Sequence, residues 1–164
     1  MRIGVVSDTH GRAANAQAAA IVLAEHAVEA VLHCGDIGSD DVVRAFDLWP
    51  THFVLGNTDD QPAALERAIL AAGQTYHGAF GDLRLGNRRI ALLHGDDTRR
   101  LKETIASQQY DLVCYGHTHV AATRREGRTL VLNPGALHRA KTYTIAVVDL
   151  TELNATHIAV PVTP

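Results

Sequence analysis

The sequence has few cysteines, no long apolar run and no excess of positive charge. Its two cysteines, Cys34 and Cys114, are too few for a disulfide framework, and both lie in apolar runs that favour buried free thiols. This usage is typical of a reducing, cytoplasmic location. No apolar stretch approaches the roughly 18 residues that a membrane-spanning helix needs, and the first one (residues 2–6) is too short for a signal-peptide core. We therefore expect no membrane association.

The charge is nearly balanced and slightly negative. Lys and Arg number 15, Asp and Glu number 18, and the net charge is −3. Arginine pairs such as Arg99-Arg100 and Arg124-Arg125 are scattered along the chain, and we interpret them as solvated surface residues. Because the sequence contains no basic stripe, duplex nucleic acid is not an expected partner.

The chain has the length and composition of one globular domain spanning residues 1–164, with 46% apolar and 20% charged residues. Apolar runs predict strands at 2–6, 30–32, 51–55, 75–80, 82–85, 88–93, 112–115, 120–125, 128–132, 142–150 and 156–162. Helices are expected at 13–27, from a Ser39 cap to about residue 48, from an Asp60 cap with Pro62 in the first turn, and at 98–108 behind a Thr98 cap. The predicted fold class is α/β, a two-sheet β-sandwich flanked by helices.

Polar clusters, most of them containing glycine, follow almost every predicted apolar strand. Five of them occupy residues 7–11, 33–36, 56–59, 94–97 and 116–119. Glycine lets the chain turn sharply and approach a ligand, and ligands of α/β sheets bind at the carboxyl ends of strands. Any one of these short motifs arises by chance, whereas five in order after five strands do not. We therefore expect the polar side chains to converge.

Seven side chains in these clusters are candidate metal ligands. Histidine is the commonest metal ligand, and the chain contains 10 histidines. Carboxylate, amide and imidazole donors without cysteine suit divalent Mn, Fe, Zn or Ni, and they argue against a structural zinc finger. The i, i+2 spacing within two pairs of ligands predicts that each pair lies on one side of an extended segment. The candidates are Asp8, His10, Asp36, Asn57, His94, His117 and His119.

Taken together, these motifs resemble the calcineurin-like metallophosphoesterase superfamily, and its small prokaryotic phosphodiesterase branch most of all. The resemblance implies a four-layer α/β/β/α fold and a site for two divalent ions, Mn foremost, with Ni, Fe, Zn or Co as alternatives. It implies that a hydroxide or water between the ions is the nucleophile. It also implies that Asp36 bridges the ions, that Asp8, His10 and His119 hold the first, and that Asn57, His94 and His117 hold the second.

Two positions depart from the pattern of that superfamily. Thr58 stands where many relatives carry a histidine as general acid, and threonine cannot donate a proton in this way at neutral pH. This favours substrates with good leaving groups and leaves the general acid unassigned. Ala136 stands where the branch usually has serine, so a hydroxyl near the site is lost. Asp59 is interpreted as a residue that orients the loop or a ligand.

The other histidines are interpreted more simply. His33 is a weak candidate for contacting substrate, and a strand-end side chain hydrogen-bonded to backbone is the preferred interpretation. His138 follows the Asn133-Pro134-Gly135 turn, and whether it lines the site is left open. Packed or surface positions are expected for His26, His52, His77 and His157.

The sequence therefore predicts a metal-dependent phosphoric ester hydrolase, most specifically a phosphodiesterase acting on a small phosphate ester. One alternative is a non-catalytic protein-interaction module, like the retromer subunit of the same fold, although that function predicts an incomplete ligand set. A phosphomonoesterase or an oligonucleotide nuclease is the other alternative. The natural substrate, the metal used in the cell and the formation of homo-oligomers are left open.

Overall fold

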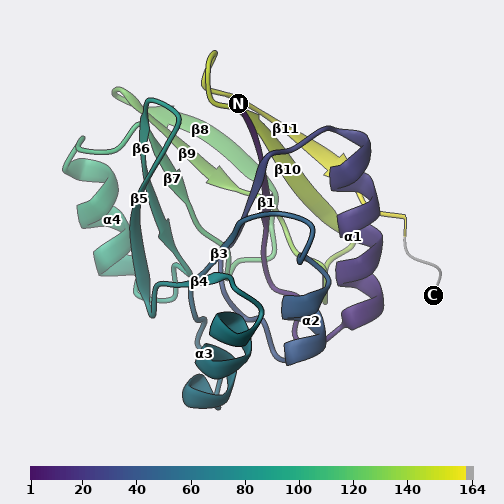
Figure 1. Ribbon diagram of the computed structural model, residues 1–164. Coiled ribbons are helices and arrows are strands. Elements are labelled where there is room, and N and C mark those ends of the chain that lie inside the picture. The colour runs from purple at the N-terminus through teal and green to yellow at the C-terminus, as the bar shows by residue number, and fades with distance from the viewer. Residues whose placement is uncertain (162–164) are drawn as a thin grey trace.

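The computed structural model describes residues 1–161 and contains two β-sheets packed face to face, with helices on both outer faces (Figure 1). The first sheet has the strand order β11 (Asn154–Ala159), β10 (Thr144–Asp149), β1 (Arg2–Val6), β2 (Ala30–His33), β3 (Thr51–Phe53) and β4 (Thr75–Tyr76). The second has the order β5 (Phe80–Leu85), β6 (Arg88–Leu93), β7 (Leu112–Cys114), β9 (Thr129–Asn133) and β8 (Ala122–Glu126). The helices are α1 (Ala13–Glu25), α2 (Asp40–Arg44), α3 (Pro62–Ala71) and α4 (Thr98–Ala106).

The apolar side chains form three packed layers, because successive residues of a strand point to opposite faces. In β1, Val5 packs between the two sheets, whereas Val6 packs against the helices on the outer face. In β6, Leu92 packs between the sheets, and Leu93 belongs to the layer that includes Ile105 of α4. Helices α1, α2 and α3 cover the first sheet and α4 covers the second, which confirms the predicted four-layer α/β/β/α fold.

Parallel strands lie at the centre of both sheets. In the first sheet β1, β2 and β3 run parallel, and in the second β6, β7 and β9 run parallel. The loops that leave β1, β2, β3, β6 and β7 contain the five polar clusters. Within residues 1–161, no helix is long and apolar enough to cross a membrane.

Several predicted boundaries and caps are wrong. The strand expected at 75–80 is only β4, because the chain turns after Tyr76 and re-enters a sheet at Phe80. Helix α1 ends at Glu25 rather than at residue 27, since Ala27 has a left-handed backbone (φ 51°) that cannot continue it. The last strand begins two residues before the predicted range 156–162, and residue 162 lies outside the described residues.

Helix capping was predicted correctly at one of three helices. The Ser39 hydroxyl accepts a hydrogen bond from the Val42 N–H, as expected of an N-cap. Helix α4 begins at Thr98, but its cap is the preceding Asp97, whose carboxylate accepts from the Arg100 N–H. Helix α3 has Gln61 rather than Asp60 at its N-cap, without a side-chain hydrogen bond, and Pro62 is its first residue.

Candidate metal centre

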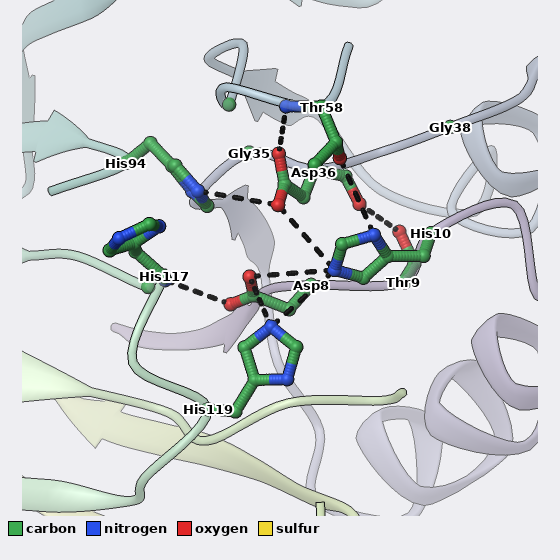
Figure 2. A network of polar contacts seen from close by, with 12 residues as sticks. Asp8, Thr9, His10, Gly35, Asp36, Gly38, Thr58, His94, His117 and His119 are labelled. Carbon is green, nitrogen blue, oxygen red and sulfur yellow. Dashed lines mark hydrogen bonds and ion pairs between the residues drawn. The ribbon is translucent and has the colours of Figure 1, made fainter. Parts of the chain in front are cut away.

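The structure brings all seven candidate ligands together at the carboxyl ends of the parallel strands. Two of them follow β1, one follows each of β2 and β3, one directly follows β6, and two follow β7. The two carboxylates are buried, and their oxygens face imidazole nitrogens from distant parts of the chain (Figure 2).

One half of the cluster is formed by Asp8, His10 and His119. Oδ1 of Asp8 lies 3.2 Å from Nε2 of His119 and 3.9 Å from Nε2 of His10. The two imidazole Nε2 atoms lie 3.4 Å apart. These three groups can hold one metal ion.

The other half is formed by Asn57, His94 and His117. Oδ1 of Asn57 lies 3.1 Å from Nε2 of His94 and 3.0 Å from Nδ1 of His117. Nδ1 of His94 lies 2.8 Å from the Cys34 carbonyl oxygen, to which it donates its hydrogen. Because Nδ1 is engaged in this way, Nε2 is the nitrogen of His94 that can offer a lone pair to a metal ion, once it has lost its own proton.

Asp36 lies between the two halves. Its Oδ2 atom is 3.4 Å from Nε2 of His10 and 3.4 Å from Nε2 of His94, and its Oδ1 atom accepts a hydrogen bond from the Thr58 N–H. Burial raises the pKa of Asp36, but the hydrogen bonds from His94 and Thr58 outweigh burial and keep this pKa well below its usual range. Burial lowers the pKa of His94, but the Asp36 carboxylate outweighs it and raises that pKa above its ordinary value.

The spacing of the donor atoms fits bound metal. Ligand bonds of about 2.1 Å that meet at about 90–110° place neighbouring donor atoms roughly 3.0–3.4 Å apart. Most of the contacts in the cluster fall in this range. The atoms they join would each offer a lone pair to a metal, so a cation between them accounts for their close approach. In addition, Oδ1 of the buried Asp8 accepts no hydrogen bond within residues 1–161, which is costly unless a cation contacts it.

The backbone at five of the candidate ligands is unusual and contradicts one expectation. The two i, i+2 pairs do not lie on extended segments, since these residues occupy left-handed turns. Asp and His adopt this conformation more readily than most residues, but each instance still costs about 1–3 kcal/mol and such residues cluster at functional sites. Left-handed φ angles occur at Asp8 (55°), His10 (46°), Asp36 (54°), His117 (65°) and His119 (58°).

Two glycines leave room for the carboxylates. A Cβ atom at Gly56 would collide with Oδ1 of Asp36. One at Gly116 would collide with the Ser7 hydroxyl and would lie 2.7 Å from Oδ2 of Asp8. The same Oδ2 atom accepts a hydrogen bond of 3.1 Å from the His117 N–H. Glycine at these positions is therefore required by the close packing of neighbouring loops.

Asp59 orients the loops, as the sequence suggested. Its buried carboxylate accepts hydrogen bonds from the backbone N–H groups of Ile37 (3.2 Å), Gly38 (2.9 Å) and Gly56 (2.9 Å). These bonds fix the loop after β2 against the loop after β3, and thus place Asp36 beside Asn57.

His33 is completely buried, which excludes it from contacting substrate. The Gly35 N–H donates to its Nδ1 atom (3.2 Å), so its Nε2–H donates to the Thr9 hydroxyl (3.0 Å). Thr9 in turn donates to the Ile37 carbonyl oxygen (3.0 Å). Burial lowers the pKa of His33 to about 3, so the imidazole is neutral and joins the loops after β1 and β2.

Asn133 positions the loop of His117 and His119. The sequence analysis identified Asn133 only as part of a turn. Its buried amide group donates to the Gly116 carbonyl oxygen (2.7 Å) and to the Thr118 hydroxyl (3.1 Å). Its Oδ1 atom accepts from the Gly135 N–H (2.9 Å). The only sequence signal for this role was the Asn-Pro-Gly turn itself.

Of the remaining histidines, one lies at the site and the others lie outside the cluster. His138 lines the site, because its ring centroid lies 5.2 Å from that of His10. The others contact groups outside the cluster: His52 stacks on His77, His26 lies 2.8 Å from the Val22 carbonyl oxygen, and His157 lies 2.8 Å from that of Asn133.

Comparisons with known proteins agree with this geometry. The sequence profile of the calcineurin-like phosphoesterase superfamily domain matches residues 1–153. A phosphodiesterase of Methanocaldococcus jannaschii is 30% identical over 138 residues, which span 82% of this chain and 83% of that protein.

Solved structures give the same result. An archaeal phosphodiesterase superposes with a TM-score of 0.89 at 28% identity, covering 97% of this chain and 99% of that one. Wild-type Vps29 of Entamoeba histolytica, complexed with zinc, superposes with a TM-score of 0.63 at 17% identity over 98% of this chain and 100% of that one, which shows a shared fold. The chain thus belongs to the calcineurin-like phosphoesterase superfamily and is a metal-dependent hydrolase of phosphoric esters.

Proposed function

We propose that this protein is a phosphodiesterase that acts on a small phosphate ester with two divalent metal ions, Mn foremost. The observation that carries the proposal is the position of Oδ2 of Asp36, at equal distances from His10 in one half of the cluster and from His94 in the other. Metal pairs in phosphoesterases lie about 3.5–4 Å apart, and a shared carboxylate oxygen suits that spacing.

Each half of the cluster would hold one ion. Asp8, His10 and His119 would hold the first, Asn57, His94 and His117 would hold the second, and Asp36 would contact both. Two such ions, when bound, lower the pKa of a bound water from 15.7 towards about 7 and neutralise charge on the phosphoryl oxygens.

The charge of the cluster favours an anionic substrate. Asp8 and Asp36 are the only carboxylates among the seven ligands, since Asn57 contributes a neutral oxygen. Two divalent ions therefore leave a net positive charge at the site, which attracts a phosphate ester.

The groups around the cluster favour esters with good leaving groups. The hydroxyl of Thr58 lies 3.4 Å from Nδ1 of His10, and this hydroxyl can orient the ring but cannot serve as a general acid near pH 7. A diester substrate agrees with the relative from Methanocaldococcus jannaschii, which is named a phosphodiesterase.

The test is hydrolysis of bis(p-nitrophenyl) phosphate by purified protein with added Mn²⁺. We expect turnover well above a control that contains Mn²⁺ without protein, and loss of turnover in His94→Ala. A matched control is His26→Ala, which removes a histidine outside the cluster whose ring is hydrogen-bonded to the Val22 carbonyl oxygen of its own helix. Wild-type activity no higher than that of Mn²⁺ alone would defeat the proposal.

A non-catalytic interaction module is less well supported. The likeness to Vps29 concerns the fold, and the presence of all seven candidate donors in one cluster favours hydrolysis. We also propose a cytoplasmic location. The two cysteines are free and buried, as is usual for proteins of a reducing compartment.

A further inference from the structure

A cleft of about 440 Å³ lies beside the metal centre, between residues 118–121 and the segment 139–144. His119, a proposed ligand, is part of its wall, so the cleft begins at the cluster itself. Two exposed cationic residues, Arg139 and Lys141, line the opposite wall.

These two cationic groups are free to bind a ligand. Within residues 1–161, neither Arg139 nor Lys141 has a carboxylate within 4.0 Å, and neither side chain donates a hydrogen bond. Several other arginines are paired, among them Arg44 with Asp40, Arg89 with Asp82, and Arg124 with Glu126. The cleft therefore combines the positive charge of the metal centre with two unpaired cations.

The backbone holds Arg139 in an unfavourable conformation at this place. Its φ angle is 50°, in the left-handed region that Asn, Asp and His adopt far more readily than arginine. Within residues 1–161 and outside the candidate ligands, Arg139 shares this conformation with three other non-glycine residues, Ala27, Gln108 and Leu153. Strained backbone is often retained where it serves a site.

A second cleft beside the cluster has the opposite character. It measures about 370 Å³ and lies between Thr58 and helix α3, with Ala64 and Leu65 in its wall. Its charged lining consists of carboxylates, among them the exposed Asp60. An anionic group is repelled from this cleft and attracted to the one lined by Arg139 and Lys141.

We propose that the cleft between His119, Arg139 and Lys141 binds a second anionic group of the substrate, a phosphate or a carboxylate carried by one arm of the ester. This inference rests on the proposed phosphodiesterase function and narrows its substrate class. The preferred substrates are phosphodiesters in which one alcohol bears a further negative charge, and the other arm is uncharged.

The test uses three diesters that share p-nitrophenol as leaving group and differ in the second arm: ethyl, 2-carboxyethyl and 2-phosphonoethyl. We expect the wild type to show a higher kcat/KM for one or both anionic esters than for the ethyl ester. In the double variant Arg139→Gln/Lys141→Gln, the ratio of kcat/KM for the anionic ester to kcat/KM for the ethyl ester falls by about tenfold, because two exposed ion pairs with the substrate are lost. Arg67→Gln/Lys102→Gln is the control, since it removes the same charge from exposed positions of α3 and α4 and retains the wild-type ratio.

Binding provides a readout without turnover. Titration calorimetry of the Mn²⁺-loaded protein compares 3-phosphonopropionate with propylphosphonate, which lacks only the carboxylate, and the corresponding bisphosphonate covers the phosphate case. We expect the wild type to bind 3-phosphonopropionate or the bisphosphonate, each with a second anionic group, more tightly than propylphosphonate. In the Arg139/Lys141 variant this difference in affinity is lost. If the wild type and the variant have the same kcat/KM ratio and the same affinities for the phosphonates, the cleft assignment is overturned. Absence of hydrolysis of all three esters defeats the phosphodiesterase function instead, and the titration then decides the cleft.

Discussion

Oδ2 of Asp36 lies 3.4 Å from Nε2 of His94, and the same oxygen is equally far from the imidazole of His10. One carboxylate oxygen therefore faces both halves of the cluster. We expect Asp36→Asn, which keeps the shape and removes the charge, to abolish binding of at least one metal ion. Hydrolysis falls by at least about 100-fold, because even groups that only support metal ligands contribute 10–100-fold. Metal content by mass spectrometry and the aryl phosphodiester assay check this, and a variant with full metal content and full activity contradicts it.

Asn133→Ala tests whether the loop of His117 and His119 needs its buried amide. The substitution leaves the buried Gly135 N–H without a partner and removes one of the two hydrogen bonds that the Gly116 carbonyl oxygen accepts, the other coming from the Thr118 N–H. We expect a cost of about 1–3 kcal/mol in the free energy of unfolding. We expect Mn²⁺ affinity to fall by about 10–100-fold as the loop loosens. Urea unfolding and metal titration measure the two effects. The control, Asn154→Ala at an exposed position of β11, changes neither, and unchanged metal affinity in Asn133→Ala removes this residue from the site.

Gly56→Ala tests the close approach of the loops after β2 and β3. The added Cβ would collide with the Asp36 carboxylate, so we expect loss of metal binding together with loss of stability. Gly78→Ala is the matched control: it meets no atom within 4 Å but has a φ of 64°, so it loses stability through backbone strain and keeps its metal. Equal metal content in the two variants would show that Asp36 has room to move.

The buried His33 predicts how stability depends on pH. Its pKa is lowered to about 3 in the folded protein, whereas the unfolded chain binds a proton below about 6.5. Between these values the unfolded state holds more protons, so the free energy of unfolding falls as the pH falls. From pH 7 to pH 5 this residue accounts for about 1–2 kcal/mol.

His33→Gln keeps an N–H group for Thr9 and does not titrate. We expect urea unfolding of the metal-free variant to lose less stability between pH 7 and pH 5 than the wild type does. Using the metal-free protein separates this effect from protonation of metal ligands. Identical pH profiles for the two proteins would mean that His33 is protonated in the folded state.

The two-sheet sandwich flanked by helices and the convergence of seven side chains were predictable from local patterns, and the resemblance to the superfamily implied the four-layer order. Apolar runs of strand length that end in Gly-containing clusters define the carboxyl edge of the sheets, and His94 needs only to follow β6 to reach it. Capping was harder, because Asp97 and Thr98 are both good N-cap residues and the choice between them depends on the direction from which the chain enters the helix.

The cationic cleft was not predictable, because no motif links its two walls. No sequence motif singles out Arg139 or Lys141, and only the folded chain places them opposite the loop of His119. The same holds for Asn133, because the Gly116 carbonyl oxygen to which it donates lies 17 residues earlier in the sequence and is an ordinary backbone group. The left-handed turns at Asp8 and His117 were missed since Asp and His fit extended segments equally well.

Anomalous X-ray diffraction from a crystal of the Mn²⁺-loaded protein tests the central claim most directly. The account predicts two anomalous peaks about 3.5–4 Å apart, with the Asp36 carboxylate in contact with both, Asp8, His10 and His119 around one, and Asn57, His94 and His117 around the other. A single peak, or peaks away from these side chains, contradicts it.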